Sequence, residues 1–357
     1  MKAVVLKGPK VLEYADIPVP RMTAEEHVLI KVEACGICGS DLRYWAGDNP
    51  WALHTLGRHV PNPPNIVLGH EYAGVVEAVN SGRYEHLVGR RVYVQAYRVC
   101  GACVFCRSGR HNLCRDTIHI GHGQGWGTMD YYPGAYAEYC LGWGDLLYPI
   151  PDDVSFAEAA MADVLSVAVH AFGRAKLRSG GDVLLIGGGP VGLSVAQVAR
   201  AKGAGRIFIA ETSPLAREVL AKFDVNVIDP ERQAIHEAIA AVAGRAAVAA
   251  VFDTVGSAET ITRSLPLLEE SGTFVNLAVH SMQVALDPAL IGSERTFTTS
   301  SNGFYGDVTE ACELIFSRRV NSGAMITDCL PLGEYQKAFD RLLGVPKQAY
   351  KVVFTPS

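Results

Sequence analysis

DVLLIGGGPVGLSVAQVARAKG, residues 182–203, is an apolar run followed by a glycine-rich turn and then by a helical pattern. The turn contains the pattern G-x-G-x-x-G, made by Gly187, Gly189 and Gly192. Such a pattern predicts a dinucleotide-binding turn when it follows a strand and opens a helix. The first glycine permits the tight turn, the second lets the backbone approach a pyrophosphate, and the third lets helix and strand pack closely. The free N–H groups at the helix start would then face the phosphates.

A carboxylate after the next apolar run bears on the choice of dinucleotide. Glu211 lies 19 residues beyond Gly192, where it can accept hydrogen bonds from the adenosine ribose and would repel a 2′-phosphate. This position favours NAD, whereas Arg217 keeps NADP as an alternative. The alternative without a cofactor is a structural glycine-rich turn with a solvated surface glutamate. Further candidate cofactor contacts lie at the helix start and at two strand ends: Pro190, Val191, Thr254 and Val279.

The chain around this turn alternates between apolar runs and helical stretches. Fully apolar strands that alternate with helices predict a parallel sheet covered on both faces, hence an α/β fold. The expected strands are 182–187, 206–210, 225–228, 249–254 and 272–279, with later helices expected at 231–243 and 257–269.

The rest of the chain has a different composition and a different pattern of apolar residues. Residues 1–150 are rich in glycine, proline and short β-type runs, which predicts a mostly β, loop-rich domain. The tail from about 295 is mixed, with a helical stretch at 307–318 and a final strand, YKVVF. A chain of 357 residues is too long for one ordinary core and fits two domains.

Composition excludes several classes of function. Hydrophobic residues make up 49% and charged residues 19%, which is a globular composition. The net charge is −5 and no block of lysine and arginine stands out, so we expect neither a nucleic-acid partner nor binding to an anionic membrane surface. The first residues lack the apolar run of a signal peptide, and no run of 18 apolar residues predicts a membrane span. We therefore expect a cytoplasmic protein.

Four of the nine cysteines lie close together. In a cytoplasmic chain such clustering indicates a metal site rather than disulfides. Four thiolates suit a closed structural zinc site, while an iron–sulfur cluster, a disulfide pair or a site without metal are the alternatives. The cluster is Cys-x-x-Cys-x-x-Cys-x7-Cys, at Cys100, Cys103, Cys106 and Cys114.

Three separate segments carry candidate ligands for a second zinc ion. They are GICGSD with Cys38, GHE with His70 and Glu71, and ADVL with Asp163. An open zinc site needs three protein ligands and one exchangeable position, which Cys38, His70 and a carboxylate would provide. Taken singly, a cysteine or a histidine of this kind is more often structural.

Together, GICGSD, GHE, the four-cysteine cluster and GGGPVG resemble the zinc-containing medium-chain dehydrogenases, near the sorbitol (polyol) and threonine dehydrogenase branches. The resemblance covers essentially the whole chain. It implies an NAD-dependent alcohol or polyol dehydrogenase with two zinc ions per subunit, assembled as a homotetramer or homodimer. It also implies a β-rich GroES-like catalytic domain, residues 1–153 and 296–357, and a doubly wound Rossmann cofactor domain, residues 154–295, with the active site in the cleft.

The resemblance also implies roles for the zinc ligands. Cys38 and His70 bind the catalytic zinc. The third ligand varies in the family, and the aspartate in ADVL favours Asp163 as a direct ligand, with Glu71 as an exchanging or outer carboxylate. Asp41 would orient a ligand, and Cys35 is expected to pack in the core.

By the same resemblance zinc acts as a Lewis acid on the substrate hydroxyl, NAD accepts the hydride, and Ser40 takes the first proton. The family often has a relay histidine three residues further on, but this chain has Arg43, which does not readily release its proton. His54, His59 or water would substitute. Arg43 would instead contact a carboxylate or phosphate of the substrate, or would be an exposed loop arginine.

Two further observations concern the substrate. The segment 301–303 lacks the arginine that polyol-type members often carry there. The loops 44–66 and 119–134 are rich in Trp, Tyr, His and Gly and suit either a pocket for a sugar-like ligand or an oligomer contact. Two rival functions remain open: a zinc enzyme with tightly held NAD that dismutates or oxidises aldehydes, and a non-catalytic NAD-binding protein.

Overall fold

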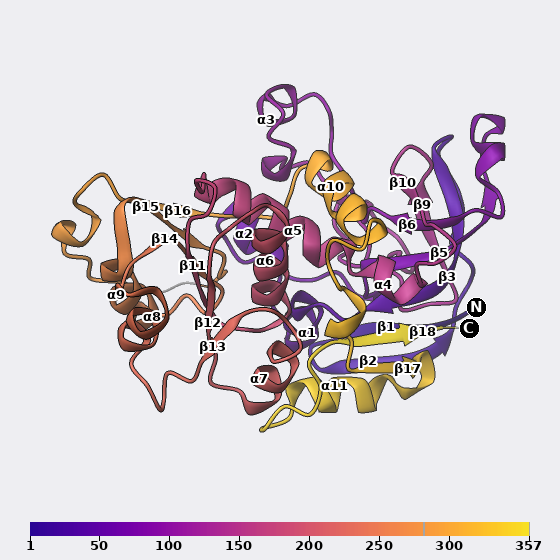
Figure 1. The fold of residues 1–357 in the computed structure, drawn as a ribbon. Helices are drawn as coiled ribbons and strands as arrows, with labels where there is room; N and C mark the ends of the chain where they lie inside the picture. Colours follow the sequence, from indigo (N-terminus) through magenta and orange to yellow (C-terminus); the bar gives the residue numbers. More distant parts are fainter. Residues whose placement is uncertain (281–282, 357) are drawn as a thin grey trace. The chain divides into compact units, whose positions relative to one another are not determined.

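The computed structural model describes residues 1–280 and 283–356, which fold as two compact units (Figure 1). Unit 1 consists of Met1–Asp163, Phe304–Arg318 and Met325–Ser357, and unit 2 of Val164–Gly303 and Arg319–Ala324. Unit 1 continues beyond residue 153 because helix α4 (Phe156–Ala160) packs against two of its strands, β3 (His27–Gly36) and β5 (Glu71–Val79).

Unit 2 contains a six-stranded, fully parallel sheet in the order β13-β12-β11-β14-β15-β16. Helices α6 (Pro190–Ala201) and α7 (Pro214–Leu220) lie on one face, and α8 (Ile235–Ala243) and α9 (Ala258–Ser264) on the other (Figure 1). This is the doubly wound order, so the predicted Rossmann fold is confirmed. The strands are β11 (Val183–Ile186), β12 (Ile207–Ala210), β13 (Asn226–Ile228), β14 (Val248–Asp253), β15 (Leu268–Asn276) and β16 (Thr296–Thr299).

Helix α9 is shorter than the sequence pattern predicts. We expected a helix over residues 257–269, but α9 ends at Ser264 and a 3-10 turn, Leu265–Leu267, leads directly into β15. Pro266 lacks a backbone N–H and cannot continue the hydrogen-bond ladder of the helix, which explains the early end.

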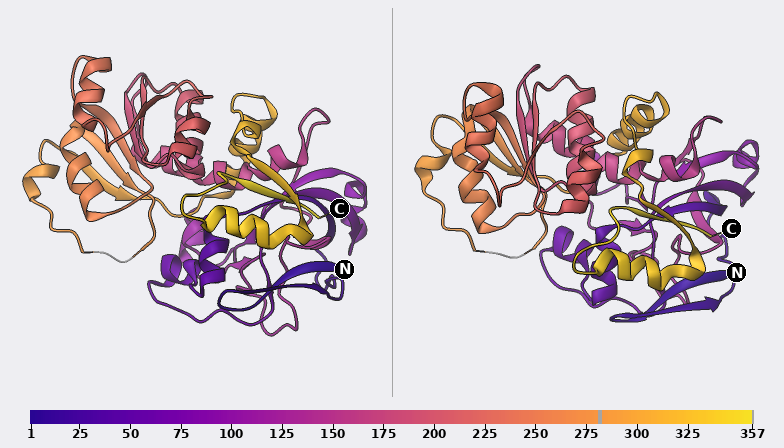
Figure 2. Two further views of the ribbon diagram at one scale, coloured as in Figure 1. Left: turned by 90° about the horizontal axis from the view of Figure 1, so that it is seen from below. Right: turned by 60° about the horizontal axis from the view of Figure 1, so that its bottom comes forward.

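Unit 1 is built mainly from antiparallel strands. Its largest sheet has the order β10-β6-β5-β3-β18-β17, with β9 also pairing with β3. Its helices are short, apart from α10 (Tyr305–Phe316) and α11 (Tyr335–Leu343), and Figure 2 shows α11 against β17 and β18. The remaining elements are β1 (Lys2–Gly8), β2 (Val11–Asp16), β4 (Ile66–Val67), β6 (Arg91–Val94), β7 (Tyr97–Arg98), β8 (Ile118–His119), β9 (Tyr139–Trp143), β10 (Leu147–Pro149), β17 (Asp328–Pro331), β18 (Val352–Thr355), α1 (Gly39–Ala46), α2 (Pro50–Leu56) and α3 (Val104–Arg107).

Each unit has a hydrophobic core of its own. The core of unit 1 is centred on large aromatic side chains such as Trp143 and Tyr72, which are almost fully buried. The core of unit 2 contains Phe208 and Phe274 between the sheet and its helices. Each core can therefore hold the site of its own unit on a packed scaffold.

One helical stretch, Phe156–Ala175, is long and apolar enough to cross a membrane by length and composition. It covers α4 and α5 (Ala162–Ala175), and 67% of its most apolar window is buried inside the structure. Glu158, Asp163 and Arg174 interrupt the apolar sequence. Such extensive burial is typical of a helix that packs in a protein core.

Candidate metal centres and dinucleotide site

The four clustered cysteines converge around one point of unit 1. The sulfur–sulfur distances are 3.5 Å for Cys103–Cys106, 3.6 Å for Cys114–Cys100 and 3.8 Å for Cys100–Cys106. Four sulfurs placed tetrahedrally about 2.3 Å from a zinc ion would lie about 3.8 Å apart. Backbone N–H groups of Ala102 and Cys103 lower the pKa of the Cys100 thiol to about 7, which favours a thiolate. All four are free cysteines, so the arrangement fits a closed tetrathiolate metal site and not a disulfide pair.

A second group of ligand types lies at one end of β3 and β5. Ligand atoms of Cys38, His70 and Glu71 all lie within 4.8 Å of one another. Strand pairing places Gly36, the last residue of β3, opposite Glu71, the first residue of β5. Cys38 follows β3 by two residues and therefore comes next to His70 and Glu71.

Asp41 orients this group and also begins helix α1. Its Oδ2 accepts a hydrogen bond from the Cys38 N–H, 2.9 Å away, in the capping box of α1, and another from the Tyr136 hydroxyl, 2.8 Å away. Its Oδ1 lies 3.3 Å from His70 Nδ1. Burial alone would raise the pKa of Asp41, but His70 and these hydrogen bonds hold it below its usual value. The expectation that Asp41 orients a ligand agrees with these contacts.

The electrostatics of the group favour a cation. Burial alone would lower the pKa of His70, but the neighbouring Asp41 and Cys38 raise it well above its usual value. Anions that favour a proton on an imidazole also favour a metal ion at the same place. Within the part of the chain that the structure describes, buried Glu71 Oε1 has no hydrogen-bond partner, so it is available to a ligand. The donor set of thiolate, imidazole and carboxylate fits zinc.

Asp163, the other predicted zinc ligand, lies in the electrostatic field of this group. Its pKa is raised to about 6, mainly by burial and also by the charge of Glu71, while His70 acts in the opposite direction. Among the residues described by the structure, Asp163 does not belong to the set whose ligand atoms lie within 4.8 Å of one another. Direct zinc binding by Asp163 stays a prediction. Cys35 is fully buried in the core, in agreement with a packing role.

The structure also places the predicted proton-transfer residues. Ser40 Oγ is buried and, within residues 1–280 and 283–356, has no hydrogen-bond partner. His54 lies on α2, and its pKa is lowered by burial and by the charge of Arg43. Arg43 itself contacts Asp48, with 3.4 Å between Nε and Oδ2, and His59 is exposed.

Two histidines of the loop 119–134 lie beside the metal group, and sequence reasoning did not single them out. The rings of His122 and His70 are 4.6 Å apart between centroids, and His119 stacks on His122 at 4.0 Å. The richness of this loop in aromatic and histidine residues was the signal for it. Lys351 was also missed, because nothing in the segment YKVVF distinguishes it from a surface lysine.

The glycine-rich turn of unit 2 has the predicted geometry. Gly187 has φ +91°, and a Cβ on Gly192 would overlap the Gly187 carbonyl oxygen, so both positions require glycine. Gly189 is the N-cap of α6, with Pro190 and Val191 in its first turn. A Cβ on Gly189 would meet no atom of the described chain within 4 Å, which leaves the helix start open to a ligand.

The other predicted cofactor residues lie near this turn to different degrees. Glu211 accepts hydrogen bonds from the N–H groups of Gly188, at 2.6 Å, and Ser213, at 2.7 Å. Thr254 Oγ1 donates to the Ile186 carbonyl, at 3.0 Å, directly before the turn. Arg217 donates to the Glu211 carbonyl and forms an ion pair of 3.1 Å with Asp229. Val279 follows the carboxyl end of β15.

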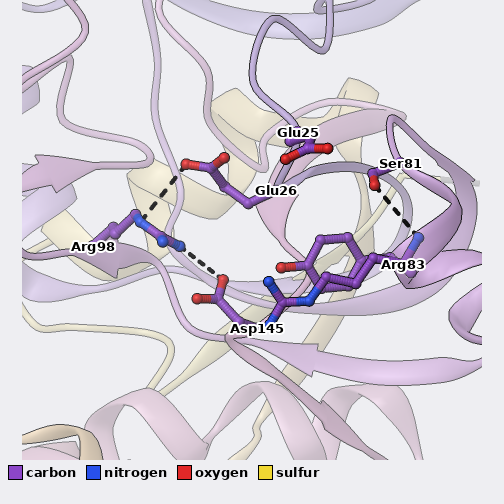
Figure 3. Close-up of a pocket in the computed structure, with 7 residues that line it drawn as sticks. Glu25, Glu26, Ser81, Arg83, Arg98 and Asp145 are labelled. Atoms are coloured by element: carbon purple, nitrogen blue, oxygen red, sulfur yellow. Dashed lines mark hydrogen bonds and ion pairs between the residues drawn. The ribbon is translucent and has the colours of Figure 1, made fainter.

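A small polar pocket elsewhere in unit 1 contains charged side chains of both signs (Figure 3). It has a volume of about 140 Å³ and is lined by Glu25, Glu26, Ser81, Arg83, Tyr84, Arg98 and Asp145. Arg98 lies 2.7 Å from Asp145 and 3.9 Å from Glu26, as the dashed lines in Figure 3 mark. This pocket is separate from the residues described above.

Comparisons with known proteins show the family to which the chain belongs. A family model described as alcohol dehydrogenase GroES-like domain matches residues 24–152, and one described as zinc-binding dehydrogenase matches residues 190–317. Sorbitol dehydrogenase of Bacillus subtilis is 30% identical and is aligned over 100% of this chain and 98% of its own length.

Two further relatives extend the comparison. D-arabitol-phosphate dehydrogenase of Enterococcus avium is 31% identical over 96% of this chain and 94% of its own. A solved structure from Sinorhizobium meliloti 1021, described as a zinc-binding dehydrogenase bound to NADP, has a TM-score of 0.86, 27% identity and 99% coverage of both chains.

Proposed function

The chain belongs to the zinc-containing medium-chain dehydrogenases, as its sequence resemblance predicted, and from this premise we propose that it oxidises a secondary alcohol, polyol, sugar or cyclitol to the ketone with NAD. The observation that carries the proposal is the convergence of half-buried Cys38 with buried His70 and Glu71. Folding alone does not require a thiol, an imidazole and a carboxylate at one point, whereas an open zinc site does.

The residues around this point have separable tasks in the proposed reaction. A zinc ion held by Cys38, His70 and a carboxylate would polarise the substrate hydroxyl as a Lewis acid. Asp41 holds the His70 ring through Nδ1, so that its other nitrogen is directed away from Asp41. Ser40 Oγ would accept the proton that the alcohol loses.

We propose NAD rather than NADP as the hydride acceptor. Glu211 places its carboxylate beside the glycine-rich turn, where it would repel a 2′-phosphate. The ion pair between Arg217 and Asp229 engages the guanidinium that would otherwise attract that phosphate. The relative from Sinorhizobium meliloti binds NADP, which makes the comparison of the two cofactors part of the test.

The test is NADH formation by the zinc-loaded protein with polyols, cyclitols, sugar acids, threonine and simple alcohols, with NAD and NADP compared. We expect turnover of one substrate class with NAD, and its loss in a Cys38→Ser variant that still binds NAD. Aldehyde dismutation without added NAD would instead support the enzyme with a tightly held cofactor. If the fully zinc-loaded protein shows no activity in either assay, the result would support a non-catalytic NAD-binding protein.

We also propose a homotetramer or homodimer in the cytoplasm. Strand β16 forms one edge of the unit 2 sheet, and the Phe297 side chain on it is 37% exposed, which suits pairing with a second copy. Light scattering coupled to size exclusion tests the assembly, and a monomer at micromolar concentration would contradict it. Fluorescence microscopy of the tagged full chain tests the location.

A further inference from the structure

A lysine lies in the interior of unit 1, beside the candidate zinc group. Lys351 is 2% exposed and directly precedes β18. Its Nζ donates hydrogen bonds to Glu71 Oε2, at 2.5 Å, and to the Ile37 carbonyl, at 2.9 Å. A buried ammonium group is stable only when its charge and its N–H groups are compensated, and these two partners supply that compensation.

Strand pairing creates this contact. Strand β3 is flanked by β5 on one side and β18 on the other. Near the end of β3, Gly36 is the partner of both Glu71 in β5 and Val353 in β18. Because a Cβ on Gly36 would overlap Glu71 Oε2, the glycine leaves room for the carboxylate. The position of the ion pair is therefore determined by the register of the sheet.

The two oxygens of Glu71 have different surroundings. Oε2 is held by Lys351, whereas buried Oε1 has no hydrogen-bond partner in the described part of the chain. Glu71 nevertheless belongs to the group with Cys38 and His70. A carboxylate anchored through one oxygen loses freedom to rotate, and its other oxygen is left open to a metal.

We propose that Lys351 is a positioning residue for the catalytic metal, which fixes Glu71 through Oε2 so that Oε1 serves as the third protein ligand. This inference rests on the proposed function and assigns the ligand position to Glu71 rather than Asp163. The positive charge of Lys351 also offsets one of the anions that Cys38, Glu71 and Asp41 bring to the site. Partners that orient metal ligands typically contribute about 10- to 100-fold in metal affinity.

The test compares Lys351→Met with Lys351→Arg in the full chain. Both proteins are loaded with cobalt, whose visible absorption reports ligand geometry, and zinc affinity is measured by competition with a chelator. We expect Lys351→Met to change the cobalt spectrum and to weaken zinc binding at one of two sites by about tenfold or more, with partial recovery in Lys351→Arg. Lys347→Met, at an exposed lysine, is the matched control and should match the parent protein.

A double-variant cycle separates positioning from folding. In a Glu71→Gln background, adding Lys351→Met should have little further effect on zinc affinity, because the contact is already broken. Additive losses, or an unchanged spectrum and affinity in a folded Lys351→Met protein, would overturn the proposal. If Lys351→Met does not fold, the cycle is run with Lys351→Gln, which also removes the charge, and is read in the same way. These readouts need no substrate, so a failure of the proposed activity would be seen separately in the turnover assay.

Discussion

At the scale of single residues, Asp41 shows how one side chain serves both local structure and the site. One carboxylate oxygen accepts the N–H of Cys38 at the start of α1, and the other faces His70. The cap places Cys38 at the helix start, while the second contact fixes the imidazole. Oδ2 accepts the hydrogen bonds of the Cys38 N–H and the Tyr136 hydroxyl, whereas Oδ1 presents its negative charge to His70 Nδ1, so the side chain needs both oxygens.

Asp41→Asn tests this double role. The amide oxygen can still accept the hydrogen bonds of Cys38 and Tyr136, but the amide nitrogen that would then face His70 Nδ1 is a donor and carries no negative charge. We expect zinc affinity at the catalytic site to fall by about 10- to 100-fold, with the four-cysteine site unaffected. Chelator competition on the purified protein measures this, and equal zinc affinities for the two proteins would show that Asp41 has only a structural role.

A second residue-scale prediction concerns the choice of cofactor. Glu211→Ser removes the carboxylate beside the glycine-rich turn and its expected hydrogen bonds to the ribose. We expect kcat/KM with NAD to fall by about tenfold or more, equivalent to about 1.4 kcal/mol, and the preference over NADP to shrink. Steady-state kinetics with both cofactors decide the matter. A preference for NAD that survives the substitution would mean that other groups select the cofactor.

At the scale of elements, local sequence patterns predicted most strands and helices, whereas they did not predict the contacts between residues far apart in the chain. Apolar runs bounded by glycines predicted the strands of unit 2, and α9 is shorter than its helical pattern because Pro266 ends it. Lys351 and Glu71 are 280 residues apart and meet through the register of β18, β3 and β5. No local pattern encodes that register, so neither the ion pair nor the position of His122 could be predicted.

The segment 100–114, which carries the four clustered cysteines and is called the cysteine lobe, is expected to depend most on metal. It has few regular elements, α3 and a 3-10 turn at His111–Leu113, and Cys100 is exposed. Cys106→Ser should lower metal content by one ion per chain and increase hydrogen exchange over residues 100–114, because metal binding and local folding are coupled. The strands of unit 2 should exchange as before, and unchanged protection of the lobe would contradict a structural metal.

Strand β15 allows a prediction about pH. Burial alone would raise the pKa of Glu269, but hydrogen bonds from Arg178 and Arg245 hold it below the usual value for glutamate. A lowered folded-state pKa gives stability that is present above the ordinary glutamate pKa, about 4.3, and is lost as pH falls through the lower value. At neutral pH, Glu269→Gln should therefore reduce the free energy of unfolding by about 1–2 kcal/mol.

Urea unfolding at neutral pH and near pH 3 measures this difference. The difference should shrink as the pH falls towards the lowered pKa of Glu269, because the parent carboxylate takes up a proton there. Glu270→Gln, at the exposed neighbouring position, is the control and should leave stability within about 0.5 kcal/mol of the parent at both pH values. A loss of stability that persists in acid would point to packing rather than to the ion pairs.

At the scale of the whole molecule, the metal groups and the candidate dinucleotide site belong to separate compact units. The two cysteine-containing metal groups lie in unit 1, and the glycine-rich turn with Glu211 lies in unit 2. Each group is held by the core of its own unit. Binding of zinc and binding of NAD should therefore be separable, although turnover requires both.

Two opposite perturbations test that separation. Removal of zinc from the catalytic group should abolish turnover and leave NAD affinity within about threefold of its original value, a change of under about 0.7 kcal/mol. Conversely, Gly192→Ala inserts a Cβ against the Gly187 carbonyl oxygen, so the turn must shift and NAD binding should fall by about tenfold or more. Its zinc content should remain that of the parent. Fluorescence titration with NAD and metal analysis give the two readings, and a Gly192→Ala protein that also lost its zinc would show that the units depend on each other for folding.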